Sequence, residues 1–139
     1  LKQGSGAIVN TASVAGLMAS PGMSAYVASK HAVIGLTKTA ATEVSGKGVR
    51  VNAVCPGPVD TRMIHSLEAQ LNPSDPKAVG DKYQASIPSG RYSTPEEIAN
   101  MVVFLCSDLA SNTTGGQFVV DGGRSSGSGA VTSLVPPKS

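Results

Sequence analysis

The sequence predicts an α/β protein built on a parallel sheet. Residues 7–13 and 49–55 are short apolar runs, rich in β-branched side chains and without polar-apolar alternation, which is typical of strands buried on both faces. Residues 24–45 lie between these runs and have the length and composition of one long helix. Strands that alternate with helices in this way favour a parallel sheet covered by helices.

The first half of the chain predicts a strand, a loop and a helix. Ser13 ends the strand over residues 7–13, at the edge where open α/β sheets bind ligands, although a serine there also serves as a plain turn cap. The Ser-Pro-Gly of residues 20–22 marks a turn, in a loop expected to line a pocket. The helix over residues 24–45 is apolar nearly all round, which predicts burial against the sheet on one side and against a neighbouring helix or a second subunit on the other.

The strand over residues 49–55 ends at a Pro-Gly-Pro sequence, which fixes a sharp exit and removes two backbone donors. Residues 62–89 predict two short helices around a break at residues 72–76. Four apolar residues there have helical spacing, and they either cover an apolar substrate as part of a lid or pack in the core. These residues are Met63, Ile64, Leu67 and Leu71.

A helix start follows at residues 94–97. Thr94 as the cap, Pro95 in the first turn and Glu97 form a capping-box pattern, which predicts a structural helix up to about residue 107. Residues 116–123 predict the final strand and its turn.

Length, charge and cysteine content narrow the class of protein. The 139 residues are 40% hydrophobic and carry a net charge of +2, with the basic residues scattered, so nothing indicates nucleic-acid or membrane-surface binding. No apolar run approaches the roughly 20 residues of a membrane span. We expect a small-molecule partner and a cytoplasmic protein, in which Cys55 and Cys106 are buried reduced thiols without a metal-ligand spacing.

Ser13, Tyr26 and Lys30 together suit proton transfer. Tyr26 and Lys30 lie one helical turn apart, so their side chains share a face. A tyrosine with the usual pKa of about 10 is a poor base at neutral pH, and a neighbouring ammonium favours its phenolate. Ser13 would present a hydroxyl to the same substrate oxygen. A serine hydrolase using Ser13 and Lys30 is a rival hypothesis, but neither a nucleophile elbow nor a Ser-x-x-Lys motif accompanies them.

Four motifs occur in an order and spacing that resemble the short-chain dehydrogenase/reductase family. They are Asn10-Thr11-Ala12-Ser13, Tyr26-x-x-x-Lys30, Asn52-Ala53-Val54-Cys55-Pro56-Gly57-Pro58-Val59-Asp60-Thr61 and Asp121-Gly122-Gly123. Together they cover roughly residues 4–123. The resemblance implies a Rossmann-like doubly wound parallel sheet and an NAD(P)-dependent oxidoreductase that interconverts a carbonyl and a secondary alcohol.

The resemblance also implies roles for individual residues. Tyr26 acts as the general acid/base, Lys30 assists it and holds the nicotinamide ribose, and Ser13 orients the substrate oxygen. Further contacts to the NAD or NADP cofactor are implied for Pro56, Gly57, Val59 and Thr61. No metal is implied. The long helix corresponds to one that joins an intersubunit bundle, so we expect a homo-oligomer, either a dimer or a homotetramer.

A nucleotide-binding α/β domain needs a Gly-rich turn after its first strand, and this sequence has none. We therefore expect residues 1–123 to be the C-terminal half of one nucleotide-binding and catalytic domain, and residues 124–139 to be a flexible tail. The full-length protein is then the enzyme, and this chain alone is inactive. The alternative is a non-catalytic fragment, pseudoenzyme or interaction module, which the mass of the natural product would distinguish.

Overall fold

The structure is a computed structural model that describes residues 1–127. Its helices and strands, in chain order, are β1 (Gly6–Thr11), α1 (Ser24–Val44), β2 (Val49–Pro56), α2 (Arg62–Leu71), α3 (Pro76–Ala85), α4 (Pro95–Cys106) and β3 (Gln117–Val120). Three single-turn 3-10 segments accompany them, η1 (Val14–Gly16), η2 (Ser45–Lys47) and η3 (Asp108–Ala110). Most of the expected tail, from residue 128 onward, lies outside the described residues.

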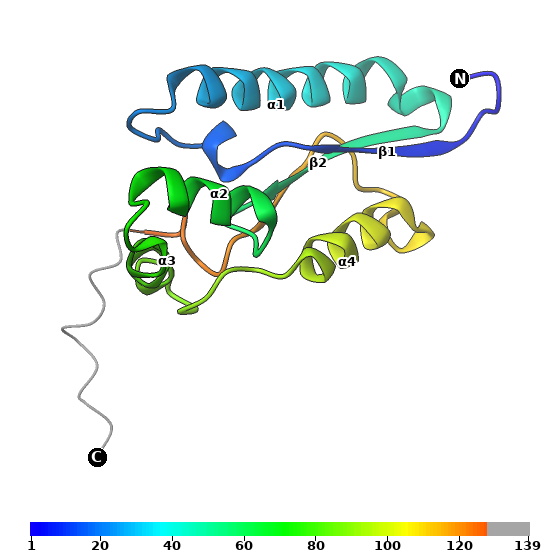
Figure 1. Cartoon of the computed structure of the whole chain (residues 1–139). Coiled ribbons are helices and arrows are strands. Elements are labelled where there is room, and N and C mark those ends of the chain that lie inside the picture. The colour runs from blue at the N-terminus through cyan, green and yellow to red at the C-terminus, as the bar shows by residue number, and fades with distance from the viewer. Residues whose placement is uncertain (128–139) are drawn as a thin grey trace.

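The three strands form one parallel sheet in the order β1-β2-β3. Pairing of β1 with β2 runs from Gly6 opposite Val49 to Thr11 opposite Val54, and β3 pairs with the second half of β2. Figure 1 shows α1 on one face of the sheet and α4 on the other. Helices on both faces of a parallel sheet confirm the α/β, doubly wound architecture.

The central strand β2 contributes the most deeply buried run of residues to the hydrophobic core. Val51, Ala53, Val54 and Cys55 are each at most 2% exposed, which confirms the prediction of a strand buried on both faces. For β1 the same prediction is wrong, because none of its residues is buried and Ile8 is 50% exposed. This difference arises because β1 is the edge of the described sheet, so its outer side has no neighbouring strand within residues 1–127.

Helix α1 buries one face against the sheet. Its buried residues are Ile34, Thr37 and Ala41, whereas Leu36 is 66% exposed. The Thr37 hydroxyl donates to the Val33 carbonyl at 2.8 Å and accepts from the Asn10 amide at 2.9 Å, so this buried polar group ties α1 to β1. Burial of the second side of α1 against another helix or subunit stays a prediction.

The second half of the chain follows the predicted elements closely. Two short helices, α2 and α3, flank the break, and the capping box at the start of α4 is confirmed. The Thr94 hydroxyl accepts from the Glu97 amide at 3.3 Å, and the Glu97 carboxylate accepts from the Thr94 amide at 2.8 Å. Within residues 1–127, none of these helices is long and apolar enough to cross a bilayer.

The two cysteines differ in environment. Cys55 is buried in β2, as expected, but the prediction that Cys106 is buried is wrong, because this residue is exposed at the end of α4. The buried face of α4 passes through Leu105, and the next residue along a helix points about 100° away from that face.

Candidate active site

The carboxyl ends of β1 and β2 bring several of the predicted residues to one edge of the sheet. The pairing continues for one bond past β1, where the Ala12 amide donates to the Val54 carbonyl at 2.8 Å. Ser13 then reaches across to β2, and its hydroxyl donates to the Pro56 carbonyl at 3.5 Å. The candidate serine and the candidate cofactor turn are therefore adjacent.

Ser13 lies just beyond β1 rather than inside it, so the predicted strand over residues 7–13 ends two residues too late. The residue caps η1, where its side-chain oxygen accepts from the Ala15 amide at 3.1 Å. Its backbone stays extended, and 8% of the residue is exposed. The turn cap is therefore confirmed, and the catalytic role of Ser13 stays a prediction.

Tyr26 and Lys30 share one face of α1, as their spacing predicts. The Lys30 ammonium lies 5.5 Å from the centroid of the Tyr26 ring. It also donates to the Thr11 carbonyl at 3.1 Å, which anchors it at the carboxyl end of β1. Tyr26 is 38% exposed, so it remains accessible to a ligand while the cation beside it is held in place.

A close backbone approach brings the turn that carries Ser13 against the helix that carries Lys30. A Cβ atom added at Gly16 would lie 2.7 Å from the Lys30 carbonyl oxygen and 2.8 Å from a methyl carbon of Ile34. Any side chain at this position would therefore separate η1 from α1. Glycine is required here because of packing and not because of a left-handed backbone.

The Pro-Gly turn after β2 makes a second close approach. The Gly57 amide donates to the Val120 carbonyl at 3.0 Å, and a Cβ atom at Gly57 would lie 2.7 Å from the Cβ atom of Asp121. Asp121 is itself 7% exposed and accepts from the Gly123 and Ser125 amides. The turn is thus packed directly onto the end of β3.

The residues after this turn are held by backbone contacts. Val59 forms a parallel bridge with Ser93, whose amide donates to the Pro58 carbonyl at 3.1 Å. Thr61 caps α2 with an extended backbone, and its hydroxyl donates to the Val59 carbonyl at 3.3 Å. The seven predicted site residues therefore fall into two groups, one around α1 and η1 and one along this turn, which meet at Ser13 and Pro56.

Cys55 lies next to this meeting point. Burial raises the pKa of its thiol, against a smaller opposing effect of a hydrogen bond with the Ser13 backbone. The thiol therefore stays neutral at physiological pH.

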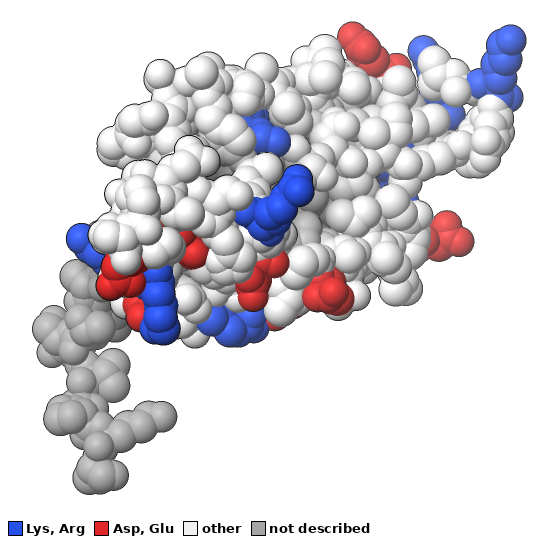
Figure 2. Space-filling view, in the orientation of Figure 1, with Lys and Arg blue, Asp and Glu red and all other residues white. Residues whose placement is uncertain are grey.

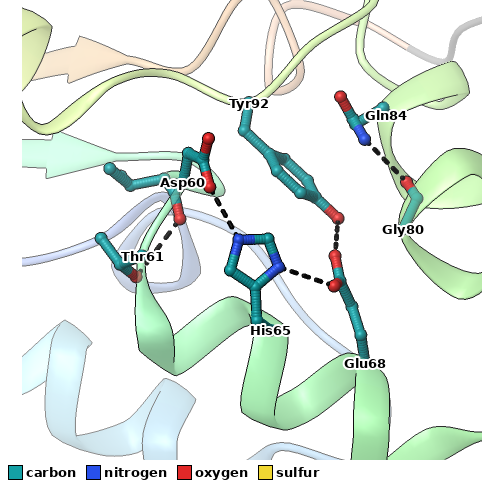
Figure 3. Close-up of polar contacts among 8 residues, drawn as sticks. Asp60, Thr61, His65, Glu68, Gly80, Gln84 and Tyr92 are labelled. Carbon is teal, nitrogen blue, oxygen red and sulfur yellow. Dashed lines mark hydrogen bonds and ion pairs between the residues drawn. The ribbon is translucent and has the colours of Figure 1, made fainter. Parts of the chain in front are cut away.

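Beside the turn lies a side-chain network that was not predicted from the sequence. We call it the His65 network, and it consists of Asp60, His65, Glu68 and Tyr92. The two ring nitrogens of His65 contact Asp60 at 2.7 Å and Glu68 at 2.9 Å, and the Tyr92 hydroxyl donates to Glu68 at 2.7 Å (Figure 3). His65 and Glu68 have the spacing of a helical side-chain pair, which is the signal that the sequence offered. Their link to Asp60 and Tyr92 depends on the fold.

The pKa values of the network follow from these contacts. Hydrogen bonds to Glu68 and then to Asp60 raise the pKa of His65. The hydrogen bond from Tyr92, followed by that from His65, lowers the pKa of Glu68. Burial, followed by the bond to Glu68, raises the pKa of Tyr92. These shifts favour the protonated form of His65 and the ionised form of Glu68.

The apolar residues of α2 do not all pack in the core. Met63 is 77% exposed and Leu71 is 58% exposed, whereas Ile64 and Leu67 are half-buried. The buried residue of this helix is the charged Glu68, because Tyr92 supplies its hydrogen-bond partner. The surface positions of Met63 and Leu71 exclude plain core packing for these two.

An open cavity lies away from the candidate site. The cavity has a volume of about 520 Å³, and none of the seven predicted site residues lines it. It is lined by Asn72, Ala78, Val79, Lys82, Tyr83, Ser86 and Arg124.

Acidic and basic side chains are interspersed on the face shown in Figure 2. Among residues 1–127, no group of three or more histidine, cysteine or acidic side chains has an arrangement that could hold a metal ion.

Comparison with protein families gives a match to the model described as enoyl-(acyl carrier protein) reductase over residues 1–125. Short-chain dehydrogenase fogB of Aspergillus ruber is 48% identical over 118 residues, which is 85% of this chain and 41% of that protein. The chain spans less than half the length of the curated relatives it matches first.

Solved structures of dehydrogenases and reductases also match this chain. The crystal structure of levodione reductase matches with a TM-score of 0.87 at 42% identity, over 90% of this chain and 48% of the other. An actinorhodin polyketide ketoreductase variant solved with NADPH matches at 37% identity and a TM-score of 0.84, over 88% of this chain and 48% of the other. A 4-hydroxyisoleucine dehydrogenase complexed with NADH matches at 38% identity and a TM-score of 0.72, over 91% of this chain and 49% of the other.

Proposed function

Because this chain belongs to the short-chain dehydrogenase/reductase family, we propose that its full-length protein is an oxidoreductase that interconverts a carbonyl and a secondary alcohol with NAD or NADP. The observation that carries the proposal is the placement of Lys30 between the Tyr26 ring and the end of β1, next to the turn of Ser13. Similar proteins solved with NADPH and with NADH support a nicotinamide cofactor, and the choice between the two stays open.

The residues at this edge fit a nicotinamide cofactor. Tyr26 stays accessible, while Gly57 and Gly16 let the turn and η1 pack closely onto Asp121 and α1. We assign Lys30 to the nicotinamide ribose, the Val59 backbone to the carboxamide, and the Pro56–Gly57 turn and Thr61 to the remaining contacts, as the family resemblance implies. The cofactor, when bound, supplies or accepts the hydride.

The chain's own residues handle the proton and the substrate. Tyr26 gives its hydroxyl proton to the substrate oxygen during reduction and takes it back during oxidation. The Lys30 ammonium lies 5.5 Å from the centroid of the Tyr26 ring, and its bond to Thr11 leaves further N–H donors for the ribose. Ser13 donates to or accepts from the substrate oxygen and fixes its orientation, after giving up its long contact with Pro56.

The exposed side of α1 supports the proposal of a homo-oligomer, a dimer or tetramer. Ala25, Ala28 and Ala32 are small and exposed on this helix, and Leu36 is 66% exposed, so a second helix can approach it closely. Size-exclusion chromatography with light scattering of the full-length protein measures the assembly, and a monomer would contradict the proposal.

The role of Tyr26 is tested by Tyr26→Phe in the full-length protein. We expect the variant to lose carbonyl reduction, because the proton donor is gone, while fluorescence titration still detects cofactor binding. Tyr83→Phe makes the same chemical change on α3 and should keep wild-type turnover. Retained turnover in Tyr26→Phe would contradict the assignment.

The 139-residue chain alone provides a second test. We expect no nicotinamide binding, because the Gly-rich half of the cofactor site is missing from this sequence. Tight binding by this chain would contradict that expectation.

A further inference from the structure

His65 is placed between two carboxylates, one on each ring nitrogen. Nε2 lies 2.7 Å from Asp60 and Nδ1 lies 2.9 Å from Glu68. A neutral imidazole has one N–H donor and one lone pair, so only the protonated ring can donate to both carboxylates. The arrangement in Figure 3 is therefore that of the cationic form.

The two contacts differ in how firmly they are held. Glu68 is 6% exposed, accepts from the Tyr92 hydroxyl and packs against α3, since a Cβ atom at Gly80 would lie 2.8 Å from its carboxylate oxygen. The Asp60 side chain is 62% exposed. When His65 loses its proton, the remaining N–H stays with Glu68, because a buried carboxylate oxygen that loses its donor costs more than an exposed one. The contact with Asp60 is then the one that breaks.

Asp60 belongs to the turn assigned to the cofactor. It lies between Val59 and Thr61, and its amide donates to the Ser93 carbonyl at 2.9 Å. The His65 amide donates to the Thr61 carbonyl at 3.3 Å, so backbone and side chain of His65 both hold this segment. Side-chain and backbone contacts thus join the turn to Tyr92 and Ser93, the segment before α4.

Resting on the proposed function, we propose that His65 is a positioning residue for the cofactor: its protonated ring holds Asp60, and through Asp60 it fixes the Val59–Thr61 segment on which the nicotinamide depends. Deprotonation frees Asp60 and loosens the segment, so cofactor affinity falls as pH rises. Tyr26, Lys30 and Ser13 lie outside the His65 network, so turnover at saturating cofactor stays unchanged.

The direction of the pH dependence follows from the groups around His65. Asp60 and Glu68 act on the ring directly, Tyr92 faces Glu68, and the charged Arg124 and the Tyr83 phenol act on Tyr92. The carboxylates raise the pKa of His65 above its ordinary 6.5. The contact with Asp60 is therefore complete below that ordinary value and is lost as pH rises through the raised pKa.

The first test is an NMR titration of the full-length protein without cofactor, with labelled histidine rings and threonine methyl groups. Thr61→Ser identifies the Thr61 methyl signal. We expect this signal to shift with the same midpoint as the His65 ring, and we expect Asp60→Asn to lower the midpoint and abolish the shift at Thr61. A Thr61 signal that does not follow His65 overturns the inference, whatever the enzyme's activity.

The second test is the KM for the nicotinamide cofactor from about pH 6 to about pH 9. We expect KM to rise about two- to fivefold in the wild type, the range for losing an exposed ion pair, with kcat unaffected by this step. Asp60→Asn should have the high KM throughout. Asp81→Asn, the same change at an exposed aspartate that pairs with Lys77, should keep the wild-type profile.

The two proposals fail in different ways. If Asp60→Asn has the same dependence of KM on pH as the wild type, the positioning role is overturned and the dehydrogenase proposal is left intact. Retained turnover in Tyr26→Phe overturns the catalytic proposal, while the NMR titration still decides whether His65 controls the Thr61 segment.

Discussion

Substitution of Gly16 by alanine tests the contact that places Ser13 beside Lys30. The added Cβ atom would lie 2.7 Å from the Lys30 carbonyl oxygen and 2.9 Å from its carbon, and real Cβ contacts essentially never fall below 3.0 Å. The Ile34 methyl carbon, at 2.8 Å, can rotate away, but the helix backbone cannot. The turn η1 and helix α1 must therefore separate by several tenths of an ångström.

The cost of this separation can be bounded. Overpacking a close-packed contact destabilises a protein by about 1–3 kcal/mol. For a domain of about 150–250 residues this lowers Tm by about 2–12 °C. Because the shift moves Lys30 relative to Ser13, kcat should also fall by roughly tenfold, given that a 1 Å misplacement can cost about a hundredfold.

The assay is thermal unfolding together with steady-state kinetics on the full-length protein. Gly46→Ala is the matched control, since a Cβ atom there meets nothing within 4 Å and the backbone is not left-handed. We expect Gly46→Ala to be neutral or up to about 1 kcal/mol stabilising. A Gly16→Ala variant with wild-type Tm and kcat would refute the packing argument.

Two further predictions concern the turn and the start of α4. Gly57→Ala places a Cβ atom 2.7 Å from the Cβ atom of Asp121, so we expect a loss of about 1–3 kcal/mol in the free energy of unfolding and a higher KM for the cofactor. The pKa of Glu97 is lowered to about 2 by hydrogen bonds from Arg91 and the Thr94 backbone. Its stabilising effect is therefore complete above the ordinary pKa of 4.5 and disappears as pH falls towards about 2, so urea unfolding should show the wild type losing its advantage over Glu97→Gln across that range.

A specific result would contradict each of these two predictions. A Gly57→Ala protein with unchanged cofactor KM would show that the turn does not approach the cofactor. A constant difference in stability between wild type and Glu97→Gln from neutral to acidic pH would show that the ion pair with Arg91 does not contribute.

Local patterns predicted the elements well because their causes are local. The capping box of Thr94 and Glu97 and the Pro-Gly exit from β2 each follow from a few neighbouring residues, and the structure contains both. The Tyr26–Lys30 pair shares a face because helical geometry alone requires it. These are the parts of the site that sequence reasoning reaches most directly.

What sequence reasoning missed depends on contacts between distant segments. Glu68 occurs within an apolar helical pattern, yet it is buried because Tyr92, from another segment, donates to it. The need for glycine at position 16 comes from the approach of η1 to α1, which no local pattern encodes. The exposed Ile8 likewise reflects the position of β1 at the sheet edge.

The parallel topology also has a consequence for how the chain folds. Among residues 1–127 no two strands can meet through a hairpin, because all pairs are parallel, and the residues that join β2 to the segment before β3 are 64 positions apart in sequence. Closing such distant segments is slow compared with forming a local helix, so α1 and α4 can form before the sheet does. During synthesis β2 emerges long before β3, so its buried side chains wait for that partner and are open to aggregation in the interval.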